Sequence, residues 1–504
     1  MATVKAQVDE SLRRPPKGTR DFYPEEMAAR RYIEDVWRRV SIRHGFQEID
    51  GPTFEALDLY KVKSGDEIVS QLFSFIDRGG RDLALRPEFT PTLARMVAAR
   101  AAGLPRPIKW FSIPRCYRAE QPQKGRLREF MQWNVDFIGE ASERSGGDKP
   151  AGAGTPARRD WSPAERAELE CLAVCVDALR EFGLDEKDFR IGWNHRQLLT
   201  DVLVGVFVPR ERLASAFYLL DRLRKYDQAG REELYRQQGC AARERDYFEF
   251  IAQVGDHSFS AWLDQLLNQM GREGAAWRSE AGVAPESIRE RGVMLEQHLS
   301  QSGLPDRCWF DFSIVRGLAY YTGWVFEITD RQGESRAIAG GGRYDQLIEM
   351  FGGPSLPAVG FGMGDVVLEI LLRDRARLPR RLLPSPDVFI VNALEDSAPA
   401  DRLVLELRRS QWDEARAQMV RPGLGVQQSY RGTRNIGKLL QEAAASGAKL
   451  AVILAPNEWG RNLVRLKNLA DRSEKEVSLA DLPAAIHAAL ATKQSLRSSV
   501  PDTQ

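Results

Sequence analysis

Residues Arg118–Asp136 read RAEQPQKGRLREFMQWNVD and carry the pattern that decides the fold. The pattern predicts two strands joined by the basic loop Pro122–Arg126, and the side chains of the second strand alternate between two faces. Met131, Trp133, Val135 and Phe137 fall on one face, and Phe130, Gln132, Asn134 and Asp136 fall on the other. We expect the apolar face to pack in a core. Because Phe130 is out of place on a solvated face, and arginines beside an aromatic ring suit a nucleotide's phosphates and base, the other face is expected to line a site.

The flanking segments mix helix and strand signals. Apolar spacing predicts a helix over 26–43 and a hairpin that includes 73–85, and the run GFQEIDGPTFE (45–55) predicts a strand that ends at Pro52. Thr90 is expected to be the N-cap of a helix with Pro91 in its first turn. Further along, Ser162 and Glu165 form a capping box before a helix over 163–182.

Composition changes mark further parts of the 504-residue chain. Residues 141–160 are rich in Gly, Ala, Pro and charge, which indicates a flexible insertion. The stretch from about 195 to 300 is helical and charged, strand patterns return at 308–328, and the Pro-rich segment 379–386 is typical of a linker. Beyond it, DVFIV (387–391), a helix over 434–446 and KLAVILA (449–455) indicate a small α/β domain.

Overall composition excludes several classes of protein. The 43% hydrophobic and 28% charged fractions are close to globular averages, which argues against a collagenous, disulfide-stapled or wholly disordered chain. The net charge of +1 neither demands nor forbids a polyanionic partner. The five cysteines are odd in number and scattered, which fits free thiols, and Cys171 and Cys175 are expected in a core. The histidines are far apart and predict no metal centre. Without a signal core or an apolar run of about 20 residues, we expect a cytoplasmic protein with no membrane association.

Three glycine-containing stretches favour structural interpretations. The run Gly432–Lys438, GTRNIGK, almost matches a phosphate-binding P-loop, but Leu439 stands where a Ser or Thr is required and the segment already reads as a helix. Neither Gly340-Gly341-Gly342 nor GFGMG (360–364) has the GxGxxG spacing of a dinucleotide site. Close packing of the backbone, or its approach to a ligand, is the favoured explanation.

Five blocks in order resemble the class II aminoacyl-tRNA synthetases, in their histidyl form. The segment 118–136 resembles motif 2, and PKGTRDF (16–22) with the following helix and Pro52 resembles motif 1. LRPEFT (85–90) resembles the amino-acid-binding segment, and RGLAYYTGWVFE (316–327) and AGGGRYD (339–345) resemble the two histidyl signatures. The resemblance covers nearly the whole chain apart from 141–160 and the C-terminal tail.

The resemblance implies an α+β catalytic domain on an antiparallel sheet, an inserted helical domain and a C-terminal α/β anticodon-binding domain. The boundaries expected are 1–190 and 305–378 for the catalytic domain, 191–304 for the helical domain, 379–386 for the linker, 387–491 for the anticodon-binding domain and 492–504 for a disordered tail. It also implies a homodimer through the motif 1 region. The expected reaction activates L-histidine with ATP and Mg²⁺, and then acylates tRNA(His).

Site residues follow from the resemblance position by position. Arg118 and Arg316 would be the catalytic residues that hold the α-phosphate of ATP, with Glu120, Arg126 and Phe130 as further ATP contacts. Histidine would be bound by Glu88, Thr90, Gln132, Asp136, Tyr320 and Tyr321. No metal site of the protein itself is implied, because Mg²⁺ enters with ATP.

Three positions depart from the sequence pattern of the family, and one of them bears on an alternative function. Val367 stands where motif 3 has an arginine, Gln121 where many members have arginine, and Ala319 where many have aspartate. The missing motif 3 arginine would suit a synthetase-like regulatory subunit of ATP phosphoribosyltransferase, which keeps the catalytic fold without ligase activity. That paralogue normally lacks a C-terminal α/β domain, whereas this chain has one and retains Arg118 and Arg316. The ligase is therefore the favoured interpretation.

Overall fold

The computed structural model describes residues 13–64, 66–139, 162–223, 226–252, 258–272, 276–301, 303–304, 308–315, 321–332 and 337–497. The chain folds into two compact units, Met1–Arg381 and Leu382–Gln504. The insertion expected at 141–160 lies outside the described residues.

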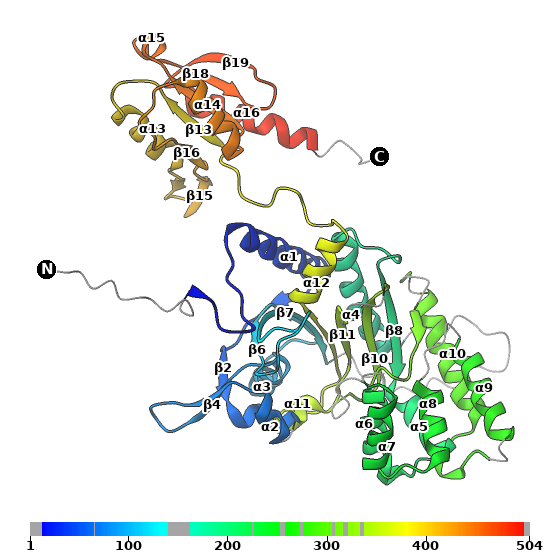
Figure 1. Ribbon diagram of the computed structural model, residues 1–504. Helices are drawn as coiled ribbons and strands as arrows, with labels where there is room; N and C mark the ends of the chain where they lie inside the picture. Colours follow the sequence, from blue (N-terminus) through cyan, green and yellow to red (C-terminus); the bar gives the residue numbers. More distant parts are fainter. Residues whose placement is uncertain are drawn as a thin grey trace, which may run out of the picture. The chain divides into compact units, whose positions relative to one another are not determined.

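A large mixed sheet forms the centre of the first unit (Figure 1). Among the described residues its path is β1-β5-β7-β12-β11-β10-β8-β9, with β6 paired to β7 beside this path. The strands are β1 (Gln47–Glu48), β5 (Ile108–Ser112), β6 (Arg115–Tyr117), β7 (Glu129–Ile138), β8 (Phe189–His195), β9 (Cys308–Phe310), β10 (Trp324–Asp330), β11 (Ala339–Arg343) and β12 (Ala358–Gly364). Neighbours from β5 to β8 are antiparallel, which confirms the predicted antiparallel sheet.

Helices α1 (Pro24–Arg43), α4 (Pro163–Glu181) and α12 (Asp365–Asp374) pack against this sheet, and α1 also packs against α4 and α12. Trp37 of α1 stacks on Trp133 of β7 with ring centroids 5.8 Å apart. Ser162 caps α4 through the reciprocal bonds of a capping box, as predicted. The thiols Cys171 and Cys175 of α4 are fully buried in the same core. The apolar face of β7 is therefore a core face.

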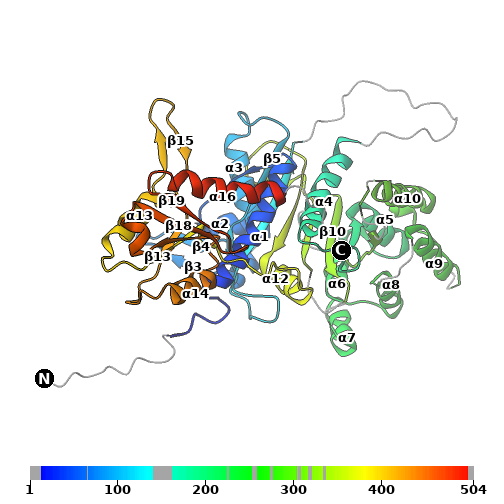
Figure 2. The ribbon, with the colours of Figure 1, turned by 90° about the horizontal axis from the view of Figure 1, so that it is seen from above.

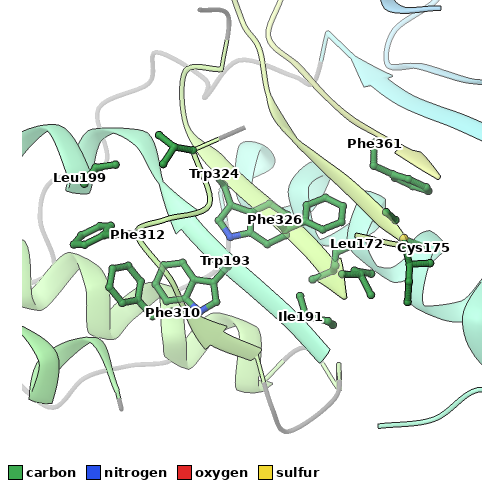
Figure 3. Close-up of a cluster of buried hydrophobic side chains, with 14 of the residues drawn as sticks. Leu172, Cys175, Ile191, Trp193, Leu199, Phe310, Phe312, Trp324, Phe326 and Phe361 are labelled. Carbon is green, nitrogen blue, oxygen red and sulfur yellow. The ribbon is translucent and has the colours of Figure 1, made fainter. Parts of the chain in front are cut away.

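The helices after β8 are α5 (Arg196–Val206), α6 (Leu213–Leu223), α7 (Gln228–Gln237), α8 (Ala242–Ala252), α9 (Phe259–Arg272) and α10 (Pro285–Gln301), with short 3₁₀ turns at Arg210–Arg212 and Ser279–Ala281. Figure 2 shows them gathered beside β10. Phe310 and Phe312, with centroids 4.2 Å apart, join these helices to Trp193 of the sheet (Figure 3). Since β8 extends to His195, the helical stretch begins at Arg196 instead of 191.

A small sheet in the order β2-β4-β3 is formed by residues that lie between β1 and β5 of the large sheet in sequence. It contains β2 (Phe54–Ala56), β3 (Ser74–Ile76) and β4 (Asp82–Leu85), next to α2 (Leu57–Ser64), the 3₁₀ turn Asp66–Gln71 and α3 (Thr90–Arg100). The predicted hairpin is confirmed. The strand expected to end at Pro52 is shorter than predicted, because β1 covers only Gln47–Glu48, and a further strand, β2, begins after the proline. Pro52 has no N–H to pair, and β1 and β2 join different sheets on either side of it. The N-cap of α3 is Phe89, one residue before the predicted Thr90.

The second unit contains a five-stranded sheet in the order β16-β13-β17-β18-β19, counted over the described part of the chain. Its elements are β13 (Val388–Asn392), α13 (Ala398–Arg408), β16 (Val426–Gln428), α14 (Ile436–Ser446), β17 (Leu450–Leu454), α15 (Pro456–Trp459), β18 (Leu463–Asn468), β19 (Glu474–Ser478) and α16 (Leu482–Arg497). The three strands β16, β13 and β17 are parallel, as an α/β unit requires. Asn435 caps α14 by accepting from the N–H of Lys438 at 3.0 Å, so GTRNIGK begins a helix.

Two features of the second unit differ from prediction. A two-stranded ribbon, β14 (Gln411–Asp413) with β15 (Gln418–Arg421), follows α13. Trp412 and Met419 are paired across the ribbon and are both exposed, so the ribbon has no buried face from which the sequence could predict a strand. Helix α16 runs to Arg497, so residues 492–497 of the expected disordered tail are helical. In the first unit, a further short helix, α11, spans Leu347–Met350.

Candidate functional site

A cavity of about 380 Å³ lies over the polar face of β7, a size typical of small-molecule sites. Eight residues predicted from the sequence line it: Glu88, Thr90, Arg118, Arg126, Phe130, Gln132, Asp136 and Tyr321. They come from the start of α3, the loop between β6 and β7, β7 itself and the segment before β10. The polar face of β7 is thus brought together with segments far away in the sequence.

One end of the cavity combines an arginine with an aromatic ring. The Arg118 guanidinium carbon lies 4.9 Å from the centroid of the Phe130 ring, and its Nε donates to the carbonyl of Pro87 at 3.1 Å. Arg126 lines the cavity and forms an ion pair with Glu120, which does not line it. The guanidinium of Arg118 is therefore held before any ligand arrives, beside a flat apolar surface.

The other end is built around a buried carboxylate. Asp136 is 6% exposed and accepts a hydrogen bond from the hydroxyl of Tyr344, which is 2% exposed. Burial, followed by the negative charge of Asp136, raises the pKa of Tyr344 well above its usual value. The phenol therefore stays protonated and donates. Next along the face, Gln132 Nε2 donates to Asn134 Oδ1 at 2.8 Å, which orients both amides.

Glycines of β12 make room for these polar side chains. The register places Gly360 opposite Asp136 and Gly362 opposite Asn134. A Cβ at Gly360 would lie 2.3 Å from Asp136 Oδ1, and one at Gly362 would lie 2.4 Å from Gln132 Nε2. A Cβ at Gly360 would also lie 2.7 Å from the backbone carbonyl of Val135, so glycine is required there, whereas a side chain at position 362 would displace the amide of Gln132.

The predicted site is incomplete in three respects. Arg316 and Tyr320 lie outside the described residues. Val367, which stands where the family's motif 3 has an arginine, lines the cavity as an apolar side chain that is 9% exposed. Sequence reasoning also missed Tyr344, although its position within AGGGRYD could have drawn attention to it.

Metal and membrane signals are absent from the described part of the chain. No group of three or more His, Cys, Asp or Glu side chains there is arranged to hold a metal ion. Among the helices that the structure describes, none has the length and apolarity needed to cross a bilayer.

The second unit has a cavity of its own, of about 830 Å³. It lies where β13 and β16 end, and Asn392, Gln428, Tyr430, Arg431 and Arg434 are among its lining residues. Tyr430 is 87% exposed. In parallel α/β sheets, ligands bind outside the carboxyl ends of the strands, so this is the edge at which a ligand is expected.

Comparisons with known proteins agree on one family. A family model described as histidyl-tRNA synthetase matches residues 18–146 and 163–365. The histidine–tRNA ligase of Opitutus terrae is 39% identical, covering 91% of this chain and 94% of its own length. The chloroplastic/mitochondrial histidine–tRNA ligase of Arabidopsis thaliana is 32% identical, covering 93% of this chain and 85% of its own length. The crystal structure of a histidyl-tRNA synthetase from Nostoc shares the fold, with a TM-score of 0.67 at 24% identity over 94% of this chain and 99% of that one.

Proposed function

The chain belongs to the histidyl-tRNA synthetase family and is a histidine–tRNA ligase, and from this premise we propose that the cavity over β7 is where histidine is activated. The main support for this proposal is that Phe130, Gln132 and Asp136 lie along one face of β7 and line the cavity. Arg118, from the loop before β7, lies beside Phe130. A nucleotide and an amino acid bound to these two groups would meet between them.

The chemistry of the first step suits this arrangement. The histidine carboxylate attacks the α-phosphorus of ATP in line, and pyrophosphate leaves, so catalysis consists mainly of alignment and stabilisation of charge on phosphate oxygens. Arg118 and Arg316 would bind the α-phosphate, with Arg126 and its ion-paired Glu120 at the nucleotide and Phe130 against adenine. We propose that ATP enters as its Mg²⁺ complex. No side chain has to remove a proton from a carboxylate that is already ionised.

The other end of the cavity would select the amino acid. Glu88, Thr90 and Gln132 would bind the ammonium group, and Asp136, Tyr320 and Tyr321 would face the imidazole. Tyr344 would orient the Asp136 side chain by donating a hydrogen bond to one of its oxygens. An imidazole held at both nitrogens is distinguished from an apolar side chain because the wrong ligand would leave buried polar groups unpaired.

The second unit supports a ligase over the regulatory alternative. The curated histidine–tRNA ligases align over more than nine-tenths of this chain, so their likeness includes residues beyond the catalytic part. We propose that residues 387–491 bind the anticodon region of tRNA(His), with the cavity next to Tyr430, Arg431 and Arg434 as the contact site. Aromatic stacking and arginine contacts are the usual means of holding unpaired bases.

Three finer properties are proposed with the activity. We propose a homodimer through the motif 1 region, in which residues 16–22 and α1 take part. We propose a cytoplasmic location, which the reduced, buried Cys171 and Cys175 suit. The domain boundaries expected from the sequence are otherwise retained as a proposal, with the helical part beginning at Arg196 and the last helix of the C-terminal domain ending at Arg497.

Substitutions at the two ends of β7 test the division of the cavity. Phe130→Leu should raise the KM for ATP with little effect on the KM for histidine, and Asp136→Asn should do the reverse. ATP–pyrophosphate exchange, with each substrate varied at saturating levels of the other, measures both constants. Equal effects of both variants on both constants would contradict the division.

A further inference from the structure

The N-terminal segment 16–22 lies directly against the elements that build the cavity. The N–H of Arg128 donates to the carbonyl of Gly18 at 2.8 Å. Gly18 has φ +87°, and a Cβ there would lie 2.7 Å from Pro122 Cγ, so only glycine fits this close approach. The segment then continues to Arg20, which reaches the start of α12.

Asp365, the first residue of α12, is a buried carboxylate with both oxygens used. Its side chain is 4% exposed, Oδ2 lies 2.5 Å from Arg20 Nη2, and Oδ1 accepts the backbone N–H of Met131 at 2.9 Å. Arg20 has a second, longer ion pair of 3.5 Å with Glu369. Burial raises the pKa of Asp365, whereas the positive charge of Arg20 opposes that rise. Asp365 thus connects the N-terminal segment to β7 through its two oxygens.

The hydrogen bond between Asp365 and Met131 lies next to the part of β7 that faces the cavity. The pairing of β12 with β7 ends at Gly364 and Gln132. The side chain of Asp365 accepts a hydrogen bond from the next backbone N–H of β7, that of Met131. Met131 separates Phe130 from Gln132, and both of these side chains line the cavity. The carboxylate therefore holds the strand at the point between the groups that bind the two substrates.

We propose that Asp365 is a positioning residue for adenylate formation, which fixes β7 at Met131 so that Phe130 and Gln132 face the cavity together, with Arg20 compensating its buried charge. The proposal rests on the proposed function, because it takes Phe130 as an ATP contact and Gln132 as a histidine contact. It also gives a role to Asp365, which directly follows the GFGMG run: Val367, two residues later, offers ATP no cation at the cavity wall, whereas Asp365 secures the strand that carries Phe130.

The test compares Asp365→Ala with a matched control, Asp201→Ala. Both aspartates are 3% exposed and paired with an arginine, but Asp201 pairs with Arg291 in the helical part and does not line the cavity. ATP–pyrophosphate exchange gives KM and kcat for each substrate, and thermal unfolding gives Tm. Asp365→Ala should raise the KM values for ATP and for histidine by about tenfold or more. Asp201→Ala should lower Tm but change each of these KM values by less than about twofold.

Asp365→Asn serves if the alanine variant does not fold. The amide keeps an acceptor for Met131 but loses the charge that binds Arg20, so both KM values should rise by about threefold or more, and Arg20→Lys should affect them less than Arg20→Ala. Lowered Tm with both KM values unchanged in the Asp365 variants would overturn the inference and leave a purely structural role. Absence of histidine-dependent exchange in the unmodified protein would instead overturn the proposed function, and the inference with it.

Discussion

Replacing Tyr344 with phenylalanine removes one hydroxyl from the cavity and leaves the ring in place. That hydroxyl donates to Asp136, a carboxylate that is only 6% exposed. A hydrogen bond to a charged group contributes about 1.5–3 kcal/mol, and its loss leaves a buried oxygen without that donor. If Asp136 binds the imidazole, kcat/KM for histidine should fall by roughly 10- to 150-fold.

The effect should appear in the KM for histidine more than in the KM for ATP, because Asp136 lies at the far end of β7 from Phe130. ATP–pyrophosphate exchange with the two substrates varied separately distinguishes these cases. Tyr235→Phe is the matched control, since Tyr235 is also 2% exposed and its hydroxyl donates to Glu249 at 2.8 Å, outside the cavity. An unchanged KM for histidine in Tyr344→Phe, or an equal rise in Tyr235→Phe, would refute the reasoning.

Three further predictions concern other parts of the chain. Arg118→Ala should slow adenylate formation by at least about 100-fold with little change in Tm, because its guanidinium would stabilise transition-state charge; a loss below about tenfold, measured by single-turnover kinetics, would place the phosphate elsewhere. Truncation after Arg381, where the two units divide, should preserve histidine activation and strongly weaken tRNA charging, and unchanged charging would assign the second unit another role. His44→Gln should lower Tm more near pH 5.5 than near pH 9. A hydrogen bond to Glu170 raises the pKa of His44 above 6.5 despite burial, so its stabilising effect is present below that value and is lost as pH rises through the raised pKa; equal losses at both pH values would contradict this.

Local patterns in the sequence predicted the parts of the site that a single segment determines. The two faces of β7 could be assigned because side chains alternate along any strand, and Phe130, Gln132 and Asp136 all line the cavity as expected. The capping box at Ser162 is equally local, and it too is confirmed.

Contacts between distant segments could not be predicted in the same way. Tyr344 and Asp136 are 208 positions apart, and Arg20 and Asp365 are 345 apart, so no periodicity connects them. The short β1 and the separate strand β2 beyond Pro52 were not predicted, because strand partners are chosen by the tertiary fold. The ribbon at Trp412 was missed because both of its faces are polar or exposed, which leaves no alternation to detect.

The most direct test of the central claim is ATP–pyrophosphate exchange by the full-length protein with each of the twenty standard amino acids. The arrangement of Gln132, Asp136 and Tyr344 predicts exchange with histidine alone, at a rate that depends on Mg²⁺. Exchange with a different amino acid would contradict the assignment of the selecting groups. No exchange with any of them, at any ATP concentration, would contradict the ligase activity itself.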